Sequence, residues 1–216
     1  MNSAVNTMTR VYIYKRFERF WHWCQAVLVI FMAVTGFEIH GTYELFGFEK
    51  AVSFHRIAAY LLLVLIAFAI FWHFTTDGWR HYIPTRRNFI AQVRFYMFGI
   101  FKGEPHPTAE TELSKLNPLQ RLVYLGLKLV IIPILVISGL LYMYYSTLGN
   151  YLELLDKIGL ESIALWHTLG AFLMMSFLVV HIYMTTTGHT PLSNIKAMLT
   201  GYEEIEPENK KEEDTK

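Results

Sequence analysis

The stretch LLLVLIAFAIFW, residues 61–72, decides the fold of this chain because it would be apolar on every side of a helix. A helix at the surface of a soluble protein instead has one apolar stripe and one polar face. The apolar block around this stretch covers residues 54–74. A helix needs about 20 mostly apolar residues to cross ~30 Å of hydrocarbon. The block is therefore predicted to span a membrane.

Three further apolar blocks have similar lengths and cover residues 21–39, 119–145 and 163–187. The first block ends without a small-residue cleavage site, so we expect a permanent span and not a signal peptide. The sequence thus predicts an all-α fold, an integral membrane four-helix bundle formed by one domain over residues 1–202. Residues 203–216 are highly charged and are expected to be a disordered tail.

The long segment between the second and third blocks contains NFIAQVRFYMFGIF, residues 88–101. Its Phe, Tyr and Met side chains alternate with Gln92 and Arg94. This mixture is typical of a short interfacial helix in the head-group region of a bilayer.

Lysine and arginine are distributed unevenly over the segments between the blocks. The segment before the first block, the segment between the second and third, and the C-terminal tail are rich in them, whereas residues 41–53 and 146–162 are poor. Basic loops remain on the cytoplasmic side of a membrane. We therefore expect cytoplasmic N- and C-termini, with the two poor loops outside.

Composition excludes several classes of function. The formal net charge is +1, so the chain is not expected to bind nucleic acid. Cys24 is the one cysteine, which excludes an internal disulfide or a thiolate cluster, and the absence of CxxCH means that any haem is non-covalent. No GxGxxG motif is present, so a nicotinamide or flavin fold is not expected.

Histidines are the ionisable residues that recur in the predicted spans. His167 and His181 are 14 residues apart, nearly four helical turns, so the two imidazoles lie within about 40° of one face and ~21 Å apart along the axis. At matching depths, His22 faces His181 and His55 faces His167. Two axial pairs inside a bundle predict two b-type haems stacked across the bilayer.

His73 and His40 leave alternatives open. His73 follows His55 by 18 residues and shares its helix face, so it could replace His22 or His181 as a haem ligand. His40 likewise follows His22 by 18 residues and could compete as a haem ligand on the outer side. A histidine near the membrane interface can also serve only as a hydrogen-bonding residue at a helix end.

Other residues could support haem binding. Arg16, Arg19 and Arg56 lie near His22 or His55 and could pair with haem propionates, although the first two also fit the basic cytoplasmic side. Residues 28–36 and 129–139 both end in a hydroxyl residue followed by glycine, which could mark an old duplication of a helix pair but which we interpret as coincidence. Gly36, Gly139 and Gly170 could admit a macrocycle or a neighbouring helix.

Taken together, Arg19-Phe20-Trp21-His22-Trp23, Thr35-Gly36, His55, Asn117-Pro118-Leu119-Gln120, His167 and His181 resemble the two-haem cytochrome b subunits of membrane-bound bacterial oxidoreductases. These include the gamma subunit of formate dehydrogenase, the b-type cytochrome of nickel–iron hydrogenase and the membrane anchor of thiosulfate reductase. The resemblance covers residues 14–202.

This resemblance implies ligand pairs His22–His181 and His55–His167, and a quinone site near the cytoplasmic haem that includes Asn117 and Gln120. Arg121 could stabilise a reduced quinone. Without the resemblance, Asn117 and Pro118 indicate only a helix start. The expected substrate is menaquinone or ubiquinone, and the expected partner is an iron–sulfur or other electron-transfer subunit.

We accordingly expect an electron-transfer subunit in a bacterial or archaeal cytoplasmic membrane, and not a self-contained enzyme. Two other classes of function were considered. A passive membrane anchor gives no reason for histidines at matched depths. A histidine-lined proton or ion transporter predicts carboxylates inside the spans, and Glu38 lies only at an outer end.

Overall fold

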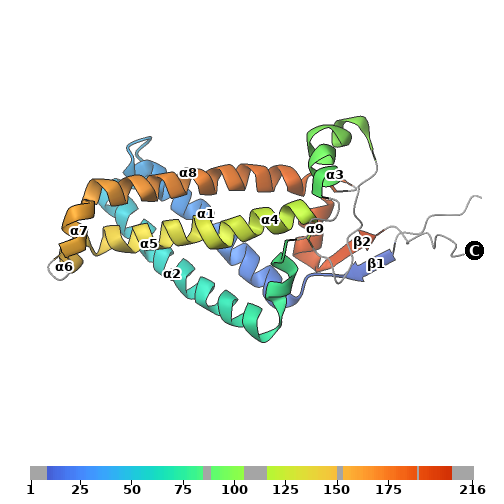
Figure 1. Ribbon diagram of the computed structural model, residues 1–216, viewed down its shortest axis with the longest axis horizontal. Helices are drawn as coiled ribbons and strands as arrows, with labels where there is room; N and C mark the ends of the chain where they lie inside the picture. The colour runs from blue at the N-terminus through green and yellow to red at the C-terminus, as the bar shows by residue number, and fades with distance from the viewer. Residues whose placement is uncertain (1–8, 85–88, 105–115, 150–152, 189, 206–216) are drawn as a thin grey trace, which may run out of the picture.

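Four helical runs in the described residues are long and apolar enough to cross a membrane: α1 (Arg16–Ile39), α2 (Phe48–Thr75), the run Pro118–Met143, and α8 (Leu160–Thr185). The computed structural model describes residues 9–84, 89–104, 116–149, 153–188 and 190–205. The prediction of an all-α membrane bundle is confirmed (Figure 1). Some helices begin before the predicted span, because polar helical turns can continue into the head-group region; α2, for example, begins at Phe48 and not at residue 54.

The surface of the bundle is apolar, as a lipid environment requires. Large side chains such as Phe68, Phe71, Leu129 and Leu165 are each at least 60% exposed. Few residues of the spans are buried inside the protein. In a bilayer these side chains face hydrocarbon, and the helical backbone satisfies its own hydrogen bonds.

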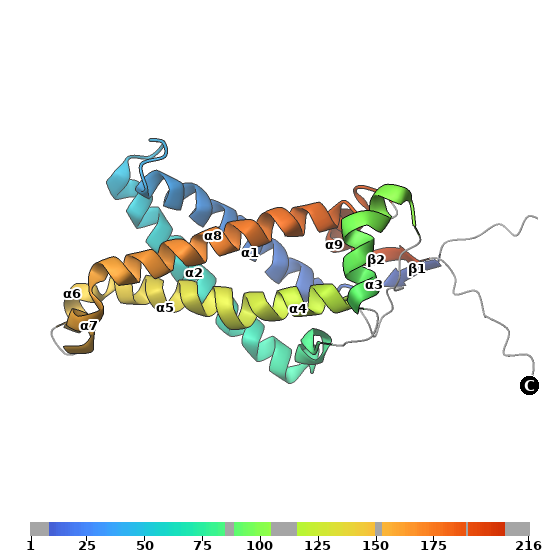
Figure 2. The same ribbon diagram turned by 45° about the horizontal axis from the view of Figure 1, so that its top comes forward.

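The spans pack as two antiparallel pairs. Helix α1 packs along α2, and α5 (Ile132–Met143) packs along α8. Figure 2 shows the α1–α2 pair crossing behind the pair formed by α8 and the third span. Residues that reach from one pair to the other are therefore the candidates for a site inside the bundle.

Glu38 fixes the hairpin between α1 and α2. Its Oε1 accepts hydrogen bonds from the backbone N–H groups of Leu45, Phe46 and Gly47, at 2.9, 2.6 and 2.8 Å. Gly47 is the N-cap of α2, so a carboxylate lies at the positive end of that helix dipole. This contact sets the register of α1 against α2, and with it the relative positions of Thr35 and His55.

The third span changes its helical pitch in the middle. It consists of α4 (Pro118–Gly126), a π-helical turn η4 (Leu127–Ile131) and α5. The Ile132 N–H bonds to the Leu127 carbonyl, five residues back. Pro133 has no N–H and its ring crowds the preceding turn, so a wider turn before it relieves the clash.

A two-stranded antiparallel sheet joins the N- and C-terminal segments. Strands β1 (Thr9–Tyr12) and β2 (Tyr202–Ile205) pair with Tyr12 opposite Tyr202, and the Arg10 guanidinium lies 4.3 Å from the Tyr202 ring centre. Both strands lie at the same end of the bundle, as four spans require (Figure 1). The expected disordered tail is therefore wrong for residues 203–205, because β1 supplies backbone partners that composition cannot reveal. Residues 206–216 lie outside the described residues.

Short helices cover the two ends of the bundle. At the end with the sheet lie η1 (Gly78–Tyr82), α3 (Phe89–Arg94), η2 (Phe95–Gly99), η3 (Ile100–Lys102) and α9 (Ser193–Thr200). At the other end lie α6 (Tyr145–Gly149) and α7 (Glu153–Ile158). The segment 88–101, expected to be a helix, is helical from Phe89 onward. Ile90 is 82% and Phe101 78% exposed, whereas Gln92 is buried. Its location in the head-group region stays a prediction.

Candidate functional site

Four histidines meet in two pairs between the helix pairs. The ring centres of His22 on α1 and His181 on α8 are 6.1 Å apart. Those of His55 on α2 and His167 on α8 are 6.3 Å apart. Helix α8 thus contributes one imidazole to each pair, as the 14-residue spacing predicts, and the partner in each pair comes from the other helix pair.

These separations are suited to a metal ion between two imidazoles. An imidazole nitrogen binds a transition metal at about 2 Å, and the ring centre lies roughly 1.1 Å behind it, so trans imidazoles have centres about 6 Å apart. Among the described residues, no group of three or more His, Cys, Asp or Glu side chains could hold a bare ion. Each pair therefore supplies two ligands only, as a bis-histidine haem needs.

A hydroxyl group orients each ring of the His55–His167 pair. Thr35 Oγ1 lies 3.0 Å from His55 Nδ1 and donates its own proton to the Phe31 carbonyl. Ser138 Oγ lies 3.1 Å from His167 Nδ1 and bonds the Ile134 carbonyl in the same way. Each hydroxyl can therefore accept from Nδ1–H, which leaves Nε2 for a metal, as is usual for ligating histidines.

Two glycines follow these hydroxyl residues and let the rings approach. A Cβ at Gly139 would lie 3.1 Å from His167 Cε1, and a Cβ at Gly36 would lie 3.6 Å from His55 Cε1. The two hydroxyl–glycine endings therefore have the same structural role, since each contacts one histidine of this pair. Each ending supplies the hydroxyl and the glycine that contact one histidine. The repeat was the sequence signal that could have identified Ser138. The third glycine, Gly170, meets Ile134 and Leu135, so it serves helix packing.

The His22–His181 pair has different surroundings. Tyr124 OH lies 3.0 Å from His181 Nδ1, and the Phe177 ring stacks on His181 with centres 5.6 Å apart and an 8° angle. His22 Nδ1 is buried and has no hydrogen-bond partner among the described residues. The sequence did not identify Tyr124, because its partner is 57 residues away on another span.

His73 and His40 lie outside both pairs. His73 Nδ1 donates to the Ala69 carbonyl at 2.6 Å, and its Nε2 is 3.3 Å from both Tyr82 OH and Lys128 Nζ. These contacts occupy both ring nitrogens. His40 is the C-cap of α1. The face that His73 shares with His55 therefore does not make it part of a histidine pair.

The three arginines proposed from sequence have different environments. Arg19 donates from NH1 to the Leu199 carbonyl, and its buried Nε has no partner among the described residues. Arg16 and Arg56 are exposed near the opposite ends of the bundle. Of the three, Arg19 is the one with an unsatisfied buried donor close to a histidine pair.

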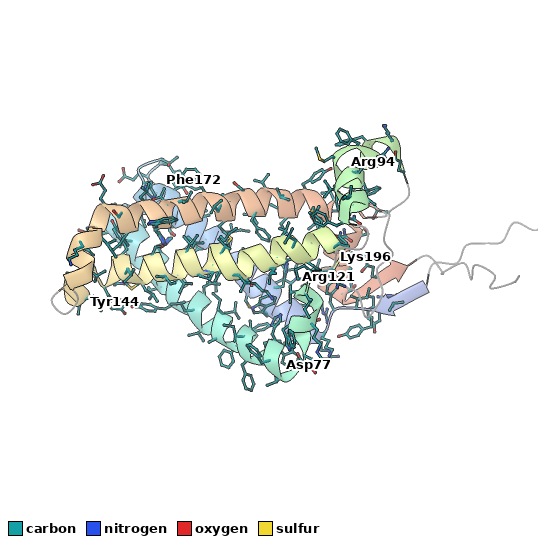
Figure 3. The ribbon with its side chains drawn as sticks, viewed as in Figure 1. Asp77, Arg94, Arg121, Tyr144, Phe172 and Lys196 are labelled. Atoms are coloured by element: carbon teal, nitrogen blue, oxygen red, sulfur yellow. The ribbon has the colours of Figure 1, made fainter. Side chains whose placement is uncertain are left out.

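Asn117 and Gln120 form a capping box at the start of α4. Gln120 N–H donates to Asn117 Oδ1 at 2.8 Å, Asn117 N–H donates to Gln120 Oε1 at 2.9 Å, and Asn117 Nδ2 donates to Tyr96 OH at 2.9 Å. Arg121 Nε donates to the Leu116 carbonyl at 3.0 Å. Figure 3 shows Arg121 at the end of the bundle where Lys196 and Asp77 also lie, opposite Tyr144. Asn117, Gln120 and Arg121 are thus brought together, and the cap occupies part of their hydrogen-bonding capacity.

The chain is similar to known proteins over most of its length. The family model described as prokaryotic cytochrome b561 matches residues 13–201. The protein named cytochrome YdhU of Escherichia coli (strain K12) is 31% identical over 207 residues, which cover 93% of this chain and 77% of that protein. The "Probable Ni/Fe-hydrogenase B-type cytochrome subunit" of Cupriavidus necator is 24% identical over 204 residues, covering 84% and 81% of the two chains.

Proposed function

The chain belongs to the prokaryotic cytochrome b561 family, and from this premise we propose that it holds two haems and carries electrons between a partner oxidoreductase and the membrane quinone pool. It is a b-type cytochrome electron-transfer subunit and a multi-pass protein of a bacterial membrane. The number of haems, the quinone and the partner are the parts that we propose.

The observation that carries the proposal of two haems is the pair of 6 Å separations, His22–His181 and His55–His167. A bis-histidine haem supplies one-electron transfer without an open coordination position. Helix α8 holds its two imidazoles ~21 Å apart along its axis, so one rigid element sets the separation across the bilayer. Thr35, Ser138 and Tyr124 orient three of the four rings.

Haem propionates need cationic partners, and the arginines proposed from sequence could supply them. Arg19 has a buried Nε that requires an acceptor, and it lies one turn before His22. Arg16 lies on the same turn of α1, and Arg56 follows His55. An Arg–carboxylate pair would compensate both the buried donor and the negative charge.

We place the quinone head group at the end of the bundle that carries the sheet, beside the His22–His181 pair. Asn117, Gln120 and Arg121 begin the third span there, at the boundary where a quinone keeps its tail in lipid and exchanges protons with water. The substrate would be menaquinone or ubiquinone. Because the cap occupies Asn117 Oδ1, the amide Nδ2 is the group available to a quinone carbonyl, in place of its bond to Tyr96.

The partner that we propose is an iron–sulfur or other electron-transfer subunit of an oxidoreductase complex. The relative from Cupriavidus necator carries the name of a Ni/Fe-hydrogenase subunit, which supports a complex of that general kind. The distribution of lysine and arginine supports cytoplasmic N- and C-termini, so the sheet and α9 would face the cytoplasm.

The deciding experiment counts haem in the purified, full-length protein. Pyridine haemochrome analysis together with amino-acid quantification should give two b-type haems per chain. One haem per chain would mean that only one of the two histidine pairs binds haem. A protein without haem would contradict the proposal and would favour a passive membrane anchor. Oxidation of the dithionite-reduced protein by a soluble quinone analogue tests the quinone link separately.

A further inference from the structure

A positively charged side chain lies inside the third span. Lys128 is in the π-helical turn η4, ten residues after Pro118. Its ammonium is 3.3 Å from His73 Nε2 and 3.1 Å from the centre of the Tyr82 ring. It thus reaches from the third span to α2 and η1. π-helical turns are frequent at functional sites because they change the direction of side chains within a helix.

In the part of the chain that the structure describes, no carboxylate forms an ion pair with this ammonium. His73 cannot compensate the charge. Its Nδ1 donates to the Ala69 carbonyl, so Nε2 is the ring nitrogen that faces Lys128, and an imidazole carries no negative charge. A cation at membrane depth is costly unless an anion or several acceptors surround it.

Two further donors lie beside Lys128. Burial and the negative charge of Glu18 raise the pKa of Tyr82 to about 12, so its phenol stays protonated near neutral pH. Trp21 Nε1 is buried without a partner among the described residues, and the Trp21 ring centre is 5.8 Å from that of His73. Around His73 Nε2, the donors Lys128 Nζ, Tyr82 OH and Trp21 Nε1 thus outnumber the acceptors that they contact, which favours a carboxylate as a further ligand.

The group is connected to both histidines of the His22–His181 pair. Trp21 precedes His22 on α1, and the Tyr82 ring centre is 6.5 Å from that of Tyr124, whose hydroxyl meets His181 Nδ1. A haem held by His22 and His181 would lie between the two helix pairs, which Lys128 and His73 also connect, from the third span to α2.

We propose that Lys128, with Tyr82 and Trp21, binds a propionate carboxylate of the haem held by His22 and His181. This inference rests on the proposed function, because it requires a haem at that pair. A propionate is an anion in both redox states of the haem and matches the ammonium of Lys128, whereas a quinone is uncharged until it is reduced. His73 then orients Lys128 through Nε2 and does not bind iron.

The test uses full-length holoprotein whose haem propionates are labelled with carbon-13 through labelled 5-aminolaevulinate. Redox difference infrared spectroscopy reports the carboxylate bands, and spectroelectrochemistry reports both midpoint potentials. Lys128→Gln should shift the label-sensitive bands and lower one midpoint, because the ferric state loses a repelling cation. A tenfold change in the ferric/ferrous equilibrium corresponds to about 59 mV for a one-electron couple. Lys128→Arg should keep bands and midpoints close to those of the parent protein.

Arg80→Gln is the matched control, since it removes a cation from the same short helix as Tyr82, but an exposed one. It should leave the bands unchanged. If Lys128→Gln proves unstable, Tyr82→Phe removes one donor from the same carboxylate and should shift the same bands. Unchanged propionate bands in both variants overturn the proposal. If the bands stay unchanged while the binding of a quinone analogue weakens, Lys128 and Tyr82 bind the quinone and not the propionate. Haem content of the same samples tests the proposed function independently.

Discussion

The hydroxyl of Ser138 lies 3.1 Å from Nδ1 of His167, and α5 thereby orients a ring that α8 carries. The contact repeats the one between Thr35 and His55 on the other helix pair. Each hydroxyl donates to its own helix and accepts from a histidine, so neither ring can rotate without losing a bond. The geometry of this pair thus depends on two side chains that do not touch the metal position.

Removal of the Ser138 hydroxyl should weaken the haem at His55–His167. For Ser138→Ala we expect roughly 10-fold lower haem affinity, because loss of a partner that orients a ligand typically costs 10–100-fold. The midpoint potential of this haem should rise, since a less basic imidazole stabilises the ferric state less. Haem titration and spectroelectrochemistry measure both. Ser176→Ala is the control, because the Ser176 hydroxyl bonds only the Phe172 carbonyl; an equal effect there would contradict the assignment.

Each histidine of α8 should control a different haem. His181→Ala should remove the haem at the end with the sheet, and His167→Ala the other, so that each variant retains one b-type haem per chain. The reason is that each pair has only two imidazoles. Pyridine haemochrome analysis and the loss of one redox transition are the measurements. Loss of a haem in His73→Ala, together with retention in His22→Ala, would show that the pairing is wrong.

The two glycines should differ in their tolerance of alanine. A Cβ at Gly139 would be 3.1 Å from His167 Cε1, closer than most real Cβ contacts, whereas at Gly36 the distance is 3.6 Å, an ordinary contact. Gly139→Ala should therefore reduce haem occupancy more than Gly36→Ala. A Cβ at Gly126 would meet no neighbouring element within 4 Å among the described residues, so Gly126→Ala should have no effect. Absorbance of the purified variants per mole of protein gives the comparison.

The membrane orientation can be tested with periplasmic reporter fusions. A reporter fused after Gly149, next to α6, should be active, and reporters after Gly103 or Gly201 should be inactive. The physical reason is the retention of lysine-rich and arginine-rich segments in the cytoplasm. The opposite pattern of activity would reverse the orientation and would move the proposed quinone site to the periplasmic side.

Asn117 can be tested with a substitution that separates helix capping from quinone binding. Asn117→Ala should cost about 1 kcal/mol of stability, because it removes an N-cap. Asn117→Ser restores a good N-cap but has no amide donor. Slow oxidation by a quinone analogue in both variants, with both haems present, would support contact between Asn117 Nδ2 and quinone. If Asn117→Ser is oxidised by the quinone analogue as fast as the parent protein, Asn117 serves only as the N-cap of α4.

The sequence by itself determined the spans and the depths of the histidines. A segment such as residues 61–72, apolar all round, is compatible only with a lipid or fully buried environment, and the 1.5 Å rise of a helix converts spacing into depth. These are local properties of one helix. The separation between His167 and His181 therefore followed from counting residues. Depth matched them with His22 and His55 but left His73 and His40 open as alternatives.

Only the tertiary structure decided which side chains complete each pair. His73 shares a helix face with His55, yet its nitrogens are committed to Ala69, Tyr82 and Lys128. Strand β2 also exists because β1 lies beside it, and the roles of Ser138 and Tyr124 depend on how the third span is rotated against α8. Rotation about a helix axis, which neither length nor hydropathy specifies, results from side-chain packing between elements far apart in the chain.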